Sequence, residues 1–161
     1  MNSVFSPAPK RGVDLTPVQE FDLKLYLGLW HEIARFDHRF ERGLGEVTAL
    51  YRLQDNGMIT VTNAGLDTKR GKRRTITGKA KTTATKGLLR VSFFLWFYSN
   101  YIVLALGENY EWALVGAGKS DKYLWILSRS PKLEEEKREA ILKEAQRRGF
   151  DTSRLIFDNP V

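Results

Sequence analysis

The chain has 161 residues, of which 42% are hydrophobic and 28% charged, and this size and composition indicate one globular domain. It contains no cysteine, which excludes disulfides, thiolate zinc sites and cysteine nucleophiles. The formal net charge of +7 comes from one stretch, because residues 66–86 hold eight lysines and arginines against a single acid.

At the N-terminus, residues 1–20 contain Pro7, Pro9 and Gly12 and are expected to form a flexible tether ahead of one domain over residues 21–161. The N-terminus lacks the charged and apolar regions of a signal peptide, so an exported protein would have lost its signal. No apolar run approaches the length of a membrane span.

Eight segments of strand-like composition follow, separated by turn signals such as Asp55-Asn56-Gly57. Several of them alternate apolar with polar residues, which predicts a sheet with one face shielded from water and one face exposed to it. Short turns between consecutive strands predict an all-β fold, an eight-stranded up-and-down antiparallel barrel with room for at most one small ligand. The expected strands are 30–35, 47–53, 58–65, 74–83, 88–94, 101–106, 112–115 and 123–128.

A helical pattern begins at Ser130-Pro131 and continues to Arg148, where Gly149 is expected to end it. Three consecutive glutamates near its start suit the positive end of the helix dipole. A narrow apolar stripe predicts that the helix packs on the outside of the barrel, and a final strand is expected after it; the stripe is Ile141, Leu142 and Ala145.

The first and last strands carry a pattern that closes one end of a barrel. The Trp30 indole is predicted to plug this base, and Gly28 lets a neighbouring segment cross closely. The Arg129 guanidinium is predicted to lie over the indole. A barrel closed at one end is a cup.

The segments 26–43 and 123–131 together resemble the lipocalin family, and within it the bacterial outer-membrane lipoprotein lipocalins related to apolipoprotein D. The resemblance extends over nearly the whole domain. One departure is Glu108-Asn109-Tyr110, which keeps only the tyrosine of the family's Thr-Asp-Tyr turn. The resemblance implies a non-enzymatic carrier of small hydrophobic molecules, in particular fatty acids or lysophospholipids, in the bacterial outer membrane or periplasm, with the cytoplasm left open.

The family's inward register gives the expected ligand-facing residues. They are mostly apolar, with small residues leaving room and a few hydrogen-bonding groups, which suits an elongated apolar molecule with one polar end. The set comprises Phe36, Ala49, Tyr51, Ile59, Val61, Asn63, Ile76, Gly78, Ala80, Leu89, Val91, Phe93, Ile102, Leu104, Ala113, Val115, Tyr123 and Trp125.

Glu32 lies two positions after Trp30 in the same strand, so its side chain is expected to point into the barrel as that of Trp30 does. It is expected there either as a core acid with a partner or as a proton-sensitive ligand contact. Aromatic residues crowd two loops at the expected mouth, where they suit an entering acyl chain, a membrane surface or a folded-back lid. These aromatic residues are Phe36, Phe40, Phe94, Trp96, Phe97 and Tyr98.

Beside the aromatic residues, a basic cluster is expected to attract carboxylate or phosphate head groups, with an ordinary solvated loop as the alternative. The cluster is Lys69, Arg70, Lys72, Arg73 and Arg74, with Arg35, Arg39 and Arg42 nearby. A rival function assigns it to an anionic membrane or to nucleic acid, and a further one places an enzyme on the barrel.

We expect no cofactor, because nothing in the sequence supplies the residues for one. His31 and His38 have no cysteine to complete a metal site. No nucleic acid is expected as the main partner, and the chain is expected as a monomer or dimer. A lipidated cysteine, which tethers many bacterial relatives, would have to precede Met1.

Overall fold

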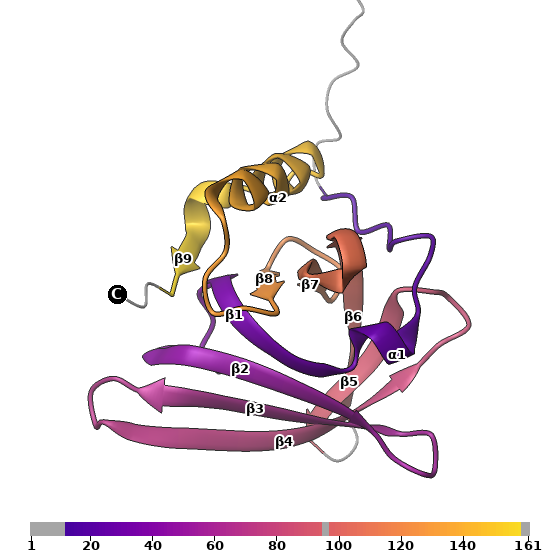
Figure 1. Ribbon diagram of the computed structural model, residues 1–161, viewed down its shortest axis with the longest axis horizontal. Helices are drawn as coiled ribbons and strands as arrows, with labels where there is room; N and C mark the ends of the chain where they lie inside the picture. Colours follow the sequence, from indigo (N-terminus) through magenta and orange to yellow (C-terminus); the bar gives the residue numbers. More distant parts are fainter. Residues whose placement is uncertain (1–11, 95–96, 159–161) are drawn as a thin grey trace, which may run out of the picture.

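The computed structural model describes residues 12–94 and 97–158, in which eight antiparallel strands close into a barrel (Figure 1). Each strand pairs with the next in the chain, and β1 pairs with both β2 and β8. The predicted fold is confirmed. The strands are β1 (Gly28–Phe36), β2 (Leu44–Leu53), β3 (Ile59–Asp67), β4 (Lys72–Thr82), β5 (Leu88–Phe94), β6 (Phe97–Leu106), β7 (Trp112–Ala117) and β8 (Tyr123–Ser128).

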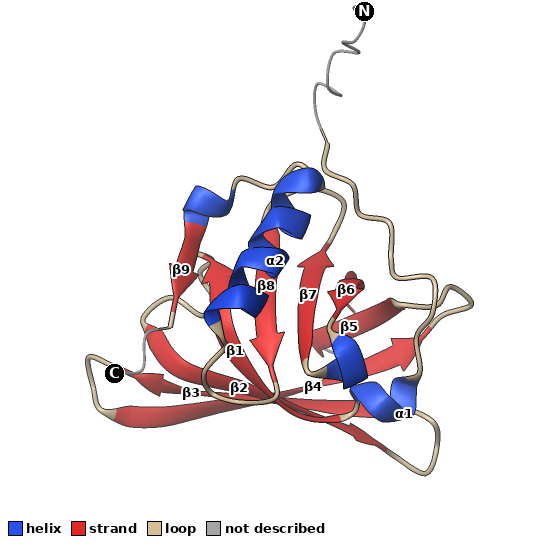
Figure 2. Cartoon of the chain, turned by 45° about the horizontal axis from the view of Figure 1, so that its top comes forward, coloured by secondary structure: helices blue, strands red, loops and turns tan. Residues whose placement is uncertain are grey.

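Short helices surround the barrel and one long helix covers its side (Figure 2). Helix α2 begins at Glu135 rather than at Ser130-Pro131, and it ends before Gly149, which has φ +99°. The elements are α1 (Leu23–Tyr26), η1 (Glu108–Tyr110), α2 (Glu135–Arg147), η2 (Thr152–Arg154) and the final strand β9 (Leu155–Phe157), which pairs with β1.

Two apolar clusters lie on the two faces of the barrel wall. The outer cluster packs between the barrel and α2, where Ile141 and Ala145 are fully buried as the stripe predicts. It also holds Ile33, Ala34, Phe36, Ile102, Leu104, Leu114, Leu124, Ile126 and Phe150. The inner cluster fills the lower barrel and holds Tyr26, Trp30, Tyr51, Ile59, Val61, Ala80, Val103, Ala113, Val115 and Leu127.

Trp30 and Arg129 close the base as predicted. The Trp30 ring is fully buried, and the Arg129 guanidinium carbon lies 3.7 Å from its centroid. Arg129 also donates to the backbone oxygens of Leu25, Leu27 and Leu29 at 2.7, 3.1 and 2.8 Å. One side chain thus ties the lead-in of β1 to the end of β8.

The part of the predicted tether that the structure describes lies against the barrel rather than apart from it. Val13 and Leu15 pack on the outer cluster, and the Asp14 amide donates to the Arg148 oxygen at 2.8 Å. Arg148 in turn donates to the backbone oxygens of Asp14, Thr16 and Leu104. Residues 12–18 therefore form a strap on the outer wall.

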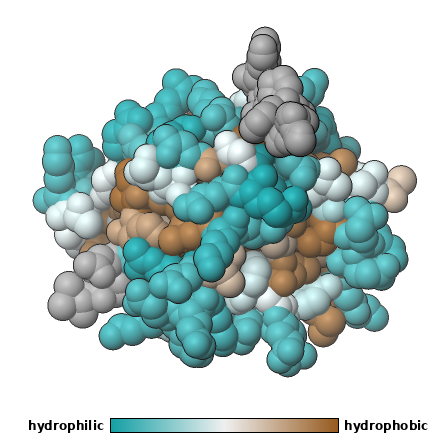
Figure 3. Space-filling view, turned by 90° about the horizontal axis from the view of Figure 1, so that it is seen from above, coloured by the Kyte–Doolittle hydropathy of each residue, from teal (hydrophilic) through white to brown (hydrophobic). Residues whose placement is uncertain are grey.

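The face that carries α2 is a mosaic of hydrophilic side chains around smaller apolar areas (Figure 3). Within the described ranges, no helix has both the length and the apolar character needed to cross a membrane.

Strand β4 is paired unequally on its two sides. Its ladder with β3 runs from Lys72 to Ala80. Its ladder with β5 starts only at Lys79 among the described residues. The β3–β4 hairpin therefore extends past β5, accompanied by β2, which pairs with β3 as far as Asp67. The loop of the hairpin forms the left edge of the view in Figure 1.

Candidate functional site

The connections between strands define two ends. The turns 54–58, 83–87 and 107–111 lie at the base with α1, and the loops 37–43, 68–71 and 118–122 lie at the opposite end, which we call the mouth. Above the packed base, several side chains of the inner wall keep part of their surface exposed, as side chains lining an open space do. These are Ala49, Val91, Phe93, Tyr101 and Trp125.

Most of the predicted ligand-facing residues lie on the inner wall. Tyr123 stacks on Trp125 with 5.8 Å between ring centroids, and Asn63 pairs in register with Ile76, which is 49% exposed at the mouth. Within the inner cluster or packed against it are Ala49, Tyr51, Ile59, Val61, Ala80, Val91, Phe93, Ala113, Val115 and Trp125. A role for any of them in ligand binding stays a prediction.

Gly78 is needed on the inner wall because the Phe93 ring occupies the space above it. A Cβ built at Gly78 would lie 2.5 Å from both the Phe93 ring and the Ser92 oxygen. The predicted small position therefore makes room for an aromatic ring of this chain.

Three predicted inward residues instead belong to the outer cluster, so the expected register is wrong there. Ile102 and Leu104 pack beneath α2, and the inner positions of β6 are Tyr101 and Val103. Phe36 is 1% exposed and contacts Phe150 on the outer side, at 6.1 Å between centroids. For Ile102 and Leu104 the error arises because β6 carries apolar residues on both faces. The alternation of apolar and polar residues therefore does not show which face points inward.

Three tyrosines join their hydroxyl groups across the lower cup. Tyr101 hydrogen-bonds to Tyr26 and, at 2.9 Å, to Tyr51. Burial raises the pKa of all three phenols, that of Tyr51 to about 12. The neutral hydroxyl groups give the cup a polar floor above Trp30, and sequence reasoning had found only Tyr51.

A second polar group lies under the β1–β2 loop, and we call it the inner polar cluster: Glu32, Arg35, His38, Glu41 and Trp125. Arg35 was expected at the mouth but is 6% exposed; it donates to Glu32 Oε1 at 3.0 Å. Its other terminal nitrogen donates to the backbone oxygens of Glu41 and Leu44. Arg35 therefore holds the loop against the wall.

Glu41 receives donors from two sides of the opening. Trp125 Nε1 donates to Glu41 Oε1 at 2.8 Å, and His38 Nε2 lies 2.7 Å from the same oxygen. The His38 ring also meets Tyr123 and Trp125 edge-on, with centroids 5.5 and 5.6 Å away. The loop thus covers two aromatic residues that were predicted to face the ligand.

The pKa values of the two carboxyl groups of this cluster are shifted in opposite directions. Burial raises the pKa of Glu32 well above its usual value, and the adjacent Glu41 raises it further against the opposing effect of Arg35. Burial would also raise the pKa of Glu41, but hydrogen bonds with His38, Glu32 and Trp125 outweigh it and lower the pKa to about 2. Of the two carboxyl groups, Glu32 is therefore the one that takes up a proton more readily. Of the two roles expected for Glu32, the contacts support a core acid with a partner.

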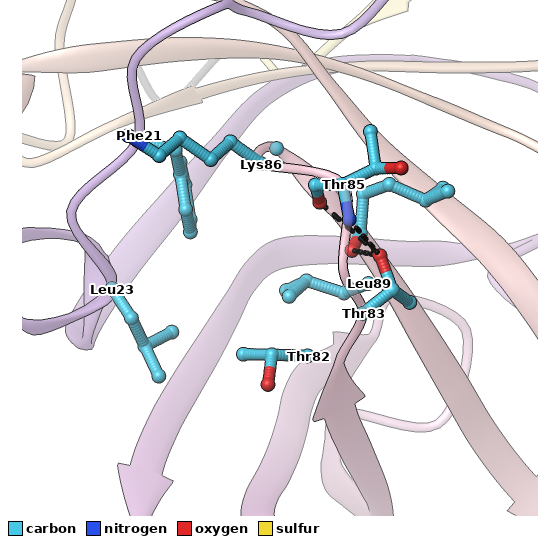
Figure 4. Close-up of a pocket in the computed structure, with 9 residues that line it drawn as sticks. Phe21, Leu23, Thr82, Thr83, Thr85, Lys86 and Leu89 are labelled. Atoms are coloured by element: carbon cyan, nitrogen blue, oxygen red, sulfur yellow. Dashed lines mark hydrogen bonds between the residues drawn. The ribbon is translucent and has the colours of Figure 1, made fainter.

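A small cavity of about 140 Å³ lies at the base between the chain before α1 and the β4–β5 turn (Figure 4). Phe21 and Leu23 form one side, and Thr82, Thr83 and Leu89 form the other. Leu89, predicted to face the ligand, therefore lines this cavity. Its volume is below the roughly 300–1,000 Å³ of sites that enclose a drug-sized ligand.

The predicted head-group residues lie on the projecting hairpin, and all five are exposed. The one acid of the hairpin, Asp67, accepts the amides of Lys69 and Arg70 at 3.1 and 3.2 Å. Phe40 is 57% exposed on the β1–β2 loop, whereas Tyr98 lies in β6 with Lys81 over its ring at 4.5 Å. Trp96 lies outside the described residues, and the side chains of Phe94 and Phe97 lie outside them too.

Comparison with known proteins agrees with this geometry. A family profile described as a lipocalin-like domain matches residues 21–160. Outer membrane lipoprotein Blc of Escherichia coli strain K12 is 51% identical over 154 residues, covering 94% of this chain and 85% of the relative. Apolipoprotein D of Mus musculus is 34% identical over 131 residues, covering 73% of this chain and 66% of the relative.

Among solved structures, insecticyanin from the tobacco hornworm Manduca sexta superposes with a TM-score of 0.74 at 22% identity. The match covers 92% of this chain and 85% of that chain. At this identity the likeness concerns the fold alone.

Proposed function

This chain belongs to the lipocalin family, whose members are binding proteins and not enzymes, and we propose that its cup binds single-chain amphipathic lipids. Fatty acids and lysophospholipids fit best. The observation that supports the proposal is the partly exposed inner wall above a packed base, formed by apolar side chains such as Val91 and Phe93. An acyl chain gains about 0.8 kcal/mol for each methylene that it buries on such a wall.

The basic hairpin suits the polar end of the same ligand. Lys69, Arg70, Lys72, Arg73 and Arg74 stand at the mouth, where a carboxylate or phosphate would remain after the chain enters. We place the protein at the outer membrane, held there by a lipid anchor, as the name of its bacterial relative suggests.

Filling the cup tests the proposal. Ala49→Trp adds an indole on the inner wall, and Leu50→Trp adds the same indole on the outer face of the same strand. We expect Ala49→Trp to weaken the binding of a fluorescent fatty acid by about tenfold or more, roughly 1.4 kcal/mol, with Leu50→Trp unchanged. Native mass spectrometry of protein purified without added lipid should show a bound lipid. Equal affinities of both variants and wild type would place the ligand outside the cup.

A further inference from the structure

The mouth carries several exposed cations whose charged groups form no ion pair among the described residues. Within residues 12–94 and 97–158, no ion pair involves Arg39, Lys69, Arg70, Lys119 or Lys122, all of which are exposed. Of the acids in these loops, Asp37 pairs with Arg42 and Asp121 with Arg154. Asp67 accepts two backbone amides, and Glu41 is held by His38 and Trp125. The loop cations are therefore free to meet a charged surface.

The turns at the base carry no such excess of charge. They contain Asp55, Glu108 and Glu111, but Lys137 lies 2.8 Å from Glu111, Lys86 lies 3.5 Å from Glu20, and Arg129 lies at the same end. The unpaired positive charge is therefore concentrated at the mouth. An anionic surface would attract the mouth more strongly than the base.

Exposed apolar groups accompany the cations at the mouth. Phe40 is 57% exposed and has the Arg39 guanidinium 5.1 Å from its ring centroid, while Ile76 on β4 is 49% exposed. Side chains of this kind enter the boundary between head groups and acyl chains when cations hold them there. Aromatic rings on which the bases of a single-stranded nucleic acid would stack are not found along the basic hairpin.

We propose that the mouth is a docking surface for an anionic lipid bilayer, contacted by the β3–β4 hairpin and by Phe40. Docking turns the opening of the cup toward the bilayer, so that an amphipathic lipid passes between them without crossing bulk water. This inference rests on the proposed function for the identity of the cargo. The docking surface itself does not depend on the cargo.

Vesicle binding tests the surface. The mouth variant Lys69→Glu/Arg70→Glu/Arg73→Glu is compared with Lys24→Glu/Arg52→Glu/Lys143→Glu, which changes the net charge equally at exposed positions outside the β3–β4 hairpin. Wild type and control should sediment with phosphatidylcholine vesicles containing one-third phosphatidylglycerol, and not with pure phosphatidylcholine. The mouth variant should bind on the order of a hundredfold more weakly. Equal losses in both variants, or no vesicle binding by wild type, would overturn the proposal.

Transfer kinetics separate docking from cargo binding. With an uncharged fluorescent fatty alcohol as cargo, head-group attraction is removed. The transfer rate from wild type to the anionic vesicles should rise with vesicle concentration, while that from the mouth variant should not. A wild-type transfer rate that is independent of vesicle concentration would overturn the docking proposal. The affinity comparison of Ala49→Trp with wild type, made without vesicles, tests ligand binding in the cup separately.

A competing polyanion completes the test. A single-stranded oligonucleotide at equal phosphate concentration should not displace wild type from the vesicles at physiological salt. If the oligonucleotide displaces wild type and binds it more tightly than the vesicles do, and if the mouth variant loses this binding, the surface is a nucleic-acid site instead.

Discussion

At the scale of single residues, the buried carboxyl pair governs how stability depends on pH. The raised pKa of Glu32 means that the folded state holds a proton that the unfolded state releases. Its stabilising contribution is complete below the ordinary glutamate pKa and is lost as pH rises toward the raised value. Glu41 acts in the opposite direction, and its contribution is lost only as pH falls toward about 2.

Glu32→Gln should therefore change the pH dependence of the free energy of unfolding. We expect wild type to lose stability relative to the variant as pH rises above the ordinary glutamate range, by at most about 1.4 kcal/mol per pH unit for one proton. Urea unfolding at several pH values measures this difference. Glu139→Gln, an exposed carboxyl on α2, should run parallel to wild type. A similarly parallel Glu32→Gln would show that Glu32 is ionised in the folded protein.

The stacked pair at the base should behave as one unit in stability. Trp30→Ala should cost ~3–5 kcal/mol, because a fully buried indole leaves a cavity. Arg129→Ala should cost less, but it leaves backbone oxygens such as that of Leu29 without their donor. Thermal or urea unfolding of both single variants and the double variant gives the coupling energy, expected at roughly 0.5–3 kcal/mol. Additive costs would mean that the two side chains act independently.

At the scale of elements, Arg148 joins three parts of the chain that are far apart in sequence. It links the end of α2 to the strap and to β6, whereas its neighbour Arg147 is 61% exposed and pairs with Glu144. Arg148→Met should speed hydrogen exchange at the amides of Asp14 and Val18, lowering their opening free energy by ~1.5–3 kcal/mol. Arg147→Met should change it by less than about 1 kcal/mol. Equal hydrogen-exchange rates in both variants would show that the Arg148 side chain does not hold the strap in place.

The strands were predictable from local turn signals in the sequence, and the closed base was predictable from the pair Trp30 and Arg129. The turns at Asp55-Asn56-Gly57 and Gly149 mark element ends by backbone conformation alone, and both glycines adopt positive φ. Trp30 and Arg129 are separated by about a hundred residues, so the prediction that they meet came from the pattern that closes a barrel and not from a local signal. The contact at 3.7 Å confirms that pairing.

The inner register of β6 and the inner polar cluster were not predictable, for two physical reasons. Ile102 and Val103 are both buried, one by α2 and one by the cup, and hydrophobicity alone cannot distinguish these two environments. The sequence around Glu41 is that of a solvated loop, and only the bonds from Arg35 and Trp125 draw it inward. Such tertiary contacts outweigh local polarity.

At the scale of the whole molecule, the barrel is closed by the strand order but not evenly along its length. The base is packed and tied by Arg129, while the mouth retains exposed inner side chains and a projecting hairpin. The contacts that stabilise the barrel are thus concentrated at the base, and the side chains proposed to bind the ligand lie nearer the mouth. Substitutions in the cup should change affinity with little effect on unfolding, as the paired Ala49 and Leu50 variants would reveal.

The free side of β4 also bears on self-association. From Lys72 to Gly78 this strand offers backbone groups without a β5 partner among the described residues, and such an edge can pair with an edge of another copy. Lys72, Arg73 and Arg74 place like charges along it, so two edges repel each other. Replacing all three with threonine should produce aggregates detectable by light scattering. Replacing them with glutamate should leave the protein monodisperse, because the edge is protected by charge of either sign.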